Sequence, residues 1–243
     1  MEIGQKIIHL DSVDSTNNYV ANLLNDGKID HGTVVLADAQ FAGKGQRSAI
    51  WSAKAGENLT FTVLLDNVNL SVSRQFYLNR MVSLSFVRFL CTIGLSPSIK
   101  WPNDIFVGGK KIGGILIENQ LYQHQIKSSI IGIGLNINQQ VFDGFTATST
   151  LLETGVYRNP KDILYGFIDA FNKTWRNYSE ASALNIKKDY SKFLYLINQP
   201  FQFEDKDGIF EGKIMDVLDS GLLVVERNGE KAHYNLKEIV FKL

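Results

Sequence analysis

The stretch KWPNDIFVGGKKIGGILIE, residues 100–118, decides the fold and raises the main functional question. Pro102 fixes its own φ angle and donates no amide hydrogen, so WPND is expected to form a rigid turn after the strand SIKW. Gly108 and Gly109 predict a hairpin that delivers Lys111 to the start of the next strand, GGILIE. Two lysines and four glycines therefore adjoin a strand with the composition of a buried one.

Strand and helix patterns alternate on both sides of this stretch. Residues 32–38 and 58–65 are typical of strands, and so is SSIIGIGLNIN further along the chain. Three helices are expected: one that begins at Ser15 or Thr16, one that ends near Gly94, and one that begins at Pro160. The chain therefore has the composition of an α/β (α+β) protein with a sizeable core.

The pattern changes near residue 200. Short strand-like segments follow, separated by DKDG, DSG and RNGE turns, and Asn228-Gly229 is a strong hairpin signal. We expect a catalytic domain at residues 1–196 and a small C-terminal β-barrel at residues 197–243. A β-hairpin extension of the main sheet is the alternative.

Composition excludes several classes of protein. The 243 residues include 25 acidic and 25 basic side chains, so no net charge favours nucleic acid or an anionic membrane. No run of about 18 apolar residues exists, and the polar N-terminus is unlike a signal peptide, so we expect a cytoplasmic protein. Cys91, the single cysteine, lies among apolar residues and is expected in the core. The four histidines show no metal-ligand spacing.

Two further segments could form a ligand site. QFAGKGQRSAIW, residues 40–51, follows a strand and combines a glycine-rich turn with Lys44 and Arg47, which suits an anion, although an ordinary solvated loop has the same composition. DSTNNY, residues 14–19, offers two hydroxyl groups and an amide in one turn. Such a cluster suits a small polar neutral group such as a cyclic urea, although capping a helix is the simpler role for any one of these residues.

Taken in order, STN, GKGQRxxxW, KWPND with KIGGILIE, and GIGLNIN closely resemble the biotin protein ligase family, over roughly residues 9–155. The resemblance implies a mixed central sheet with flanking helices, as in class II aminoacyl-tRNA synthetases, and an SH3-like C-terminal domain. It implies formation of biotinyl-5′-AMP from biotin and ATP with Mg²⁺, then transfer of biotin to a lysine of a biotin carboxyl carrier protein. A homodimer is possible.

The resemblance also assigns residues. It implies catalytic roles for Lys111, Asp104 and Arg47, with a possible Mg²⁺ site near Asp104. Biotin would contact Ser15, Thr16, Asn17, Gln40, Lys44, Gly45, Gln46, Lys111 and Gly114. ATP would contact Lys44, Arg47, Trp51, Asn103, Lys111 and Asn136.

The sequence departs from the family at the glycine-rich loop, usually Gly-Arg-Gly-Arg-x-Gly. Lys44 and Gln46 replace the two arginines, and Ser48 replaces the last glycine. Lysine keeps the charge but loses the bidentate fork, so retention of the adenylate is the step we expect to be affected. Longer family members begin with a DNA-binding domain, and we expect none here because the STN motif begins at residue 15.

Other functions are open on the sequence alone. A lipoate or octanoate ligase or transferase has an apolar ligand head, for which a polar STN cluster would be of no use. A non-catalytic biotin-binding module would need no phosphate site. A DNA-binding regulator is disfavoured by the balanced charge.

Overall fold

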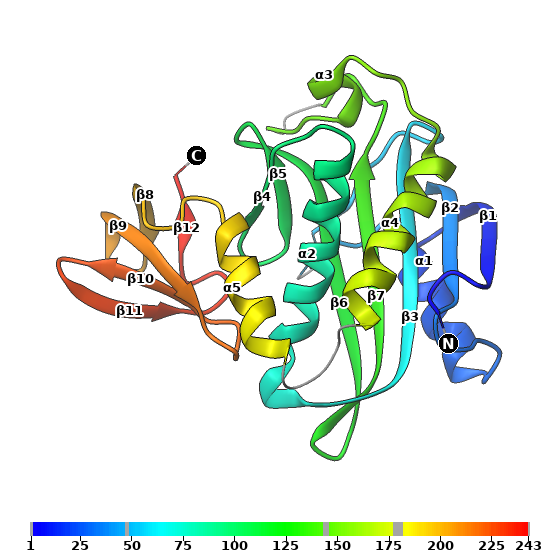
Figure 1. Ribbon diagram of the computed structural model, residues 1–243, viewed down its shortest axis with the longest axis horizontal. Coiled ribbons are helices and arrows are strands. Elements are labelled where there is room, and N and C mark those ends of the chain that lie inside the picture. Colours follow the sequence, from blue (N-terminus) through cyan, green and yellow to red (C-terminus); the bar gives the residue numbers. More distant parts are fainter. Residues whose placement is uncertain (1, 47–48, 143–145, 177–181, 243) are drawn as a thin grey trace.

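The computed structural model describes residues 2–46, 49–142, 146–176 and 182–242. Arg47, a residue of the expected site, and Ser48 of the same loop lie outside them. A large mixed sheet forms the centre, and a second, smaller sheet follows at the C-terminal end of the chain (Figure 1). Both sheets were expected from the sequence, and the α/β fold class is confirmed.

The central sheet has seven strands in the order β1-β2-β3-β7-β6-β5-β4. The pair β1–β2 is parallel and the other neighbouring pairs are antiparallel. Antiparallel neighbours follow from the short turns, among them the expected hairpin at Gly108 and Gly109, which both have positive φ. The strands are β1 (Ile7–Val13), β2 (Val34–Gln40), β3 (Asn58–Ser71), β4 (Pro97–Lys100), β5 (Asp104–Val107), β6 (Lys110–Tyr122) and β7 (Gln125–Asn136).

Helices cover the two faces of this sheet unequally. The long helices α2 and α4 pack on one face, with α5 beside α2 (Figure 1). Helix α1 packs on the other face, where Val20 contacts Val35, Leu64 and Ile130. No described helix is both long and apolar enough to cross a membrane. The helices are α1 (Thr16–Asn25), the 3₁₀ turn η2 (Val72–Arg74), α2 (Phe76–Thr92), α3 (Thr150–Thr154), α4 (Pro160–Arg176) and α5 (Ala183–Phe193).

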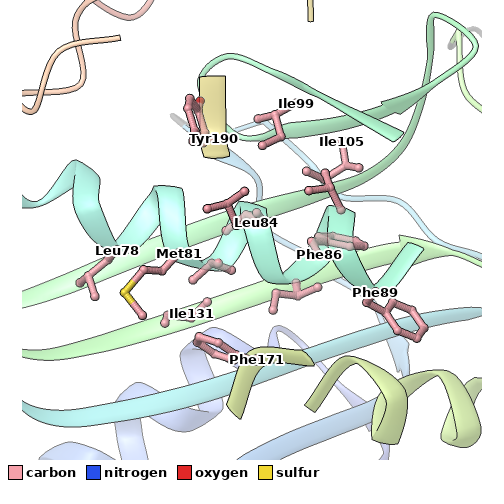
Figure 2. Packing of buried hydrophobic residues seen from close by; sticks show 14 of the residues in the cluster. Leu78, Met81, Leu84, Phe86, Phe89, Ile99, Ile105, Ile131, Phe171 and Tyr190 are labelled. Carbon is pink, nitrogen blue, oxygen red and sulfur yellow. The ribbon is translucent and has the colours of Figure 1, made fainter. Parts of the chain in front are cut away.

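The main core lies between the sheet and the long helices. Phe167 of α4 meets Phe61 and Phe86 edge to face, with ring centroids 5.3 and 5.6 Å apart. Figure 2 shows Met81 and Phe86 of α2 among the buried side chains that fill this layer. The expectation for Cys91 is wrong, because the cysteine lies on the exposed side of α2.

The C-terminal segment forms its own five-stranded antiparallel sheet, so the alternative of a hairpin added to the main sheet is wrong. Asn228 and Gly229 have positive φ in the expected turn. Apolar contacts join this sheet to the main core, and the boundary at residue 196 stays a prediction. The strand order is β11-β10-β9-β8-β12, with β8 (Pro200–Asp205), β9 (Gly208–Val217), β10 (Leu223–Arg227), β11 (Glu230–Tyr234) and β12 (Val240–Phe241).

Arg80 ties the C-terminal sheet to α2. Its guanidinium is buried, donates to the Val217 carbonyl at 2.6 Å and pairs with Asp219 at 2.6 Å. The Arg80 hydrogen bond, together with its charge, lowers the pKa of Asp219 more than burial raises it. Trp101 of the WPND turn adds a second link, because its Nε1 donates to the Gly221 carbonyl at 2.9 Å. The C-terminal sheet therefore supports the turn that precedes Asn103 and Asp104.

Replacing Arg80 with leucine is expected to lower the free energy of unfolding by about 2 kcal/mol, because the buried Val217 carbonyl loses its donor. Arg88→Leu is the matched control on the same helix. Its ion pair with Asp189 is half exposed, so its loss should cost less than about 1 kcal/mol. Urea denaturation of both variants gives the comparison. Equal losses would contradict the role given to Arg80.

Candidate active site

Glycine and threonine residues form the floor of a hollow on the α1 face of the sheet. Along β3, Thr60 and Thr62 alternate with core residues, and along β7 Gly132 and Gly134 do the same. In the paired register Thr60 faces Gly134 and Gly134 faces Gly114, next to Asp104. Because three of these floor positions lack side chains, other groups can lie close to the sheet there, and Gly114 leaves room for a ligand.

The hollow is a cavity of about 210 Å³. Its walls come from residues 40–46 and 49–51, the start of α1 and the start of β6. Its lining therefore brings together all of the described residues expected to form the site except Asn136. These are Ser15, Thr16, Asn17, Gln40, Lys44, Gly45, Gln46, Trp51, Asn103, Asp104, Lys111 and Gly114.

The STN turn lies at the N-terminus of α1, and its three side chains are almost fully buried. Ser15 is the N-cap residue, yet its side chain makes no capping hydrogen bond. Gln40 takes this role instead, because its Oε1 accepts from the Thr16 amide at 2.8 Å. Ser15 is thus the N-cap residue by position, as expected, but the capping hydrogen bond expected from its side chain is absent, and both Ser15 and Thr16 line the cavity.

Lys111 stands at the edge of the cavity. Its Nζ is 2.6 Å from Asp104 Oδ1 and 5.8 Å from the centroid of the Trp51 ring. The Lys111 backbone is held by the next segment, donating to the Thr146 carbonyl and accepting from the Thr148 amide. An ammonium group is thus fixed in the same cavity as the STN turn.

An irregularity in β6 puts Lys111 on this face. In the pairing of β5 with β6, Ile105 faces Gly113 and the next residue, Phe106, faces Lys111. Ile112 has no partner on β5 and is therefore the extra residue of a β-bulge. The bulge lets Lys111 and Gly114 point to the same side although they are three residues apart. A Cβ on Gly114 would lie 3.6 Å from Lys111 Nζ.

The glycines of this region have different neighbours. Gly114 faces the cavity, but a Cβ on Gly113 would lie 2.7 Å from the Phe86 ring in the core. A Cβ on Gly132 would lie 2.4 Å from the Asn17 side chain, and a Cβ on Gly134 would lie 2.3 Å from the Trp51 ring. In the last two cases the close approach expected from the sequence is made by a side chain of the site.

A second cavity, of about 400 Å³, adjoins the first. Trp51, Asp104 and Lys111 line both cavities, and Asn136 lines only the second. Asn136 is buried and donates to the Thr148 carbonyl at 3.0 Å. The two cavities therefore share Trp51, Asp104 and Lys111 in their walls.

Sequence reasoning gave no role to Lys100, which also lines the second cavity. Its Nζ lies 5.3 and 5.1 Å from the ring centroids of Phe106 and Phe241. Burial lowers the pKa of Lys100; Asp104 acts to raise it and Lys111 to lower it. The lysine precedes WPND in the sequence, but only the fold shows that it shares a cavity with Lys111.

A metal site would have few protein ligands. Within the described part of the chain, no three His, Cys, Asp or Glu side chains group together. Asp104 is the one carboxylate among the described lining residues, and it is paired with Lys111. This set fits Mg²⁺ that is carried mainly by substrate phosphates, as in other nucleotide sites.

Three comparisons identify relatives of this chain. The Biotin/lipoate A/B protein ligase family matches residues 10–136. The bifunctional ligase/repressor BirA of Bacillus spizizenii is 30% identical over 96% of this chain and 73% of its own length. A biotin–[acetyl-CoA-carboxylase] ligase of Paracoccus denitrificans is 27% identical, over 79% of this chain and 82% of its own.

The fold has a close counterpart among solved structures. Biotin protein ligase from Aquifex aeolicus, in complex with biotin and ATP, superposes with a TM-score of 0.79 at 24% identity, covering 98% of this chain and 99% of that one. Fold, site and relatives together define an α/β enzyme of the ligase class. The chain belongs to the biotin/lipoate A/B protein ligase family, which confirms the resemblance found in the sequence.

Proposed function

We propose that this protein is an ATP-dependent biotin ligase that works in two steps. Biotin and ATP form biotinyl-5′-AMP and pyrophosphate, and the biotinyl group then passes to a lysine of a biotin carboxyl carrier protein. One observation supports this most directly: Lys111 lies between the STN cavity and the second cavity, where two ligands would meet. The relatives named as biotin ligases support the choice of biotin.

The first step joins two anions and needs no general base, because the biotin carboxylate is already ionised. Its barrier is the repulsion between that carboxylate and the α-phosphate of ATP. An ammonium held in advance lowers this barrier by electrostatic stabilisation. Asp104 holds Lys111 Nζ at 2.6 Å, which fixes the ammonium before either substrate arrives.

In this proposal the STN turn binds the ureido head and the second cavity binds ATP. The buried Asn17 and Thr16 and the half-buried Gln40 offer hydrogen-bond donors and acceptors to a group that has both. Trp51 flanks the adenine ring, Asn136 lies in the nucleotide cavity, and the partly buried Lys100 gains from an anion nearby. Mg²⁺ bound with ATP would neutralise charge on the departing pyrophosphate.

The second step is attack by a lysine amine, which must first lose a proton because its ordinary pKa is about 10.4. Asp104 is the proposed acceptor, as the one carboxylate among the described lining residues. Its pairing with Lys111 means that Lys111 has to turn toward the phosphate before Asp104 is available.

Asp104→Asn is expected to change the pH profile of the transfer step, because an amide cannot take up the proton of the attacking amine. Single-turnover transfer from preformed adenylate, measured from pH 6 to pH 9, gives the profile. An unchanged profile with weaker ATP binding would reassign Asp104 to a phosphate or metal contact.

The function itself is tested by mixing the protein with ATP, Mg²⁺, biotin and an apo carrier domain. A gain of one biotinyl group on the carrier, read by intact mass, is the expected result. Parallel reactions with lipoate and octanoate test the nearest alternative, which belongs to the same family. Modification by lipoate alone would overturn the proposal.

A non-catalytic biotin-binding module is the second candidate. Lys100, Asp104 and Lys111, gathered at the second cavity, argue against it, because biotin alone needs no phosphate site. Biotin-dependent exchange of pyrophosphate into ATP separates the two candidates. Residence in the cytoplasm, a possible homodimer and the lack of nucleic-acid binding stay predictions.

A further inference from the structure

A chain of hydrogen bonds leads out of the first cavity to Glu118, an exposed residue that does not line it. Thr16 Oγ1 donates to Gln40 Oε1 at 3.0 Å. Thr62 Oγ1 lies 2.8 Å from Thr16 Oγ1 and 2.6 Å from Asn17 Oδ1, with geometry to donate to either. Asn17 Nδ2 donates to Glu118 Oε2 at 2.7 Å.

The chemistry of the two ends fixes the direction of these bonds. The Thr16 amide can only donate, so Gln40 must turn its oxygen toward Thr16. The Glu118 carboxylate can only accept, so Asn17 must turn its Nδ2 toward Glu118. Asn17 Oδ1 is therefore held toward Thr62.

Thr62 is fully buried and has one hydroxyl hydrogen for two neighbouring oxygens. Asn17 Oδ1 is the nearer of these and carries no hydrogen of its own, so it takes the Thr62 hydrogen. The Thr16 hydrogen is already given to Gln40. Thr16 Oγ1 is thus left able to accept a hydrogen bond from a ligand in the cavity.

We propose that Glu118 is a positioning residue that makes the cavity select a head group with an N–H directed at Thr16. It acts through Asn17 and Thr62 and does not touch the ligand. The inference rests on the proposed function, because a cyclic urea presents N–H groups of this kind. It adds a specificity determinant outside the lining of the cavity.

Glu118→Gln should allow the chain to reverse. A glutamine can donate as well as accept, so Asn17 can turn over and offer its Nδ2 to Thr62. Thr62 then gives its hydrogen to Thr16 Oγ1, which occupies one of the two lone pairs of that oxygen and weakens its acceptance from the ligand. The change removes a charge at an exposed position and leaves the size of the side chain nearly the same.

The test measures dissociation constants by calorimetry without ATP. The ligands are biotin and its two cyclic carbamate analogues, in each of which an oxygen replaces one ureido N–H. The wild type should prefer biotin to one of these analogues by at least about tenfold. Glu118→Gln should reduce that preference about fivefold or more and leave the preference over the other analogue unchanged. Glu204→Gln, whose carboxylate binds Lys242 in the C-terminal sheet, is the matched control and should change neither.

A double variant tests whether Thr62 is the relay. Thr62→Val removes only the hydroxyl group, so Thr16 still accepts and the preference for biotin is kept, even if overall affinity falls. In that background Glu118→Gln should have no further effect on the preference. A shift of the same size as in the wild type would overturn the relay. Unchanged preference in Glu118→Gln alone would overturn the inference, whereas wild-type protein that binds no biotin would overturn the proposed function.

Discussion

Lys111→Ala is expected to slow formation of the adenylate by about two orders of magnitude or more, the usual loss for one preorganised electrostatic donor. The reason is geometric. The Lys111 ammonium is the group that lines both cavities and is held by Asp104 at 2.6 Å. Without the Lys111 ammonium, no positive charge at this position would offset the repulsion between the biotin carboxylate and the α-phosphate of ATP.

Single-turnover measurement with biotin, ATP and Mg²⁺ gives the rate. Lys110→Ala is the matched control, because the neighbouring lysine is exposed and lines neither cavity. Lys111→Met separates charge from packing, since it keeps most of the aliphatic stem, and it should be as slow as Lys111→Ala. A near-normal rate in either Lys111 variant would refute the role of the charge.

Gly134→Ala is expected to raise the KM for ATP about tenfold or more. A Cβ at this position would lie 2.3 Å from the ring of Trp51, which lines both cavities, so the ring has to move from its place. In the proposed function Trp51 flanks the adenine, and stacking of a base on an aromatic ring contributes about 1–3 kcal/mol.

Gly114→Ala is the contrasting variant. Its Cβ would have no neighbour nearer than 3.5 Å and would occupy space in the first cavity. It should therefore weaken biotin binding more than it changes the KM for ATP. Equal effects of the two variants on both substrates would show that neither glycine acts in the way proposed.

Much of the fold could be predicted from local chemistry. The glycine pair at 108 and 109 and the turn at Asn228 are found where the sequence indicates them, because positive φ favours glycine and asparagine. The start of α4 at Pro160 follows from the fixed φ of proline. These signals act over a few residues, so no knowledge of the rest of the chain is needed.

Cys91 shows where local reasoning fails. Its neighbours in the sequence are apolar, but a helix turns about 100° per residue, so one member of an apolar run can still face water. The side of α2 that is covered depends on where the sheet and α4 lie. The capping role expected of the STN hydroxyl groups failed for a similar reason, because Gln40 arrives from β2 to take the Thr16 amide.

The sequence by itself predicted the strands around the site, three of the helices and the turn chemistry, and its motifs named the residues proposed for the site; helices α3 and α5 were not expected. Tertiary structure alone decided which of them meet. The bulge at Ile112 turns Lys111 toward Asp104, the pairing of β3, β7 and β6 aligns the glycine floor, and Glu118 reaches Asn17 across the sheet. Strand register and long-range packing set these contacts, and neither can be predicted from the residues that adjoin a single position in the sequence.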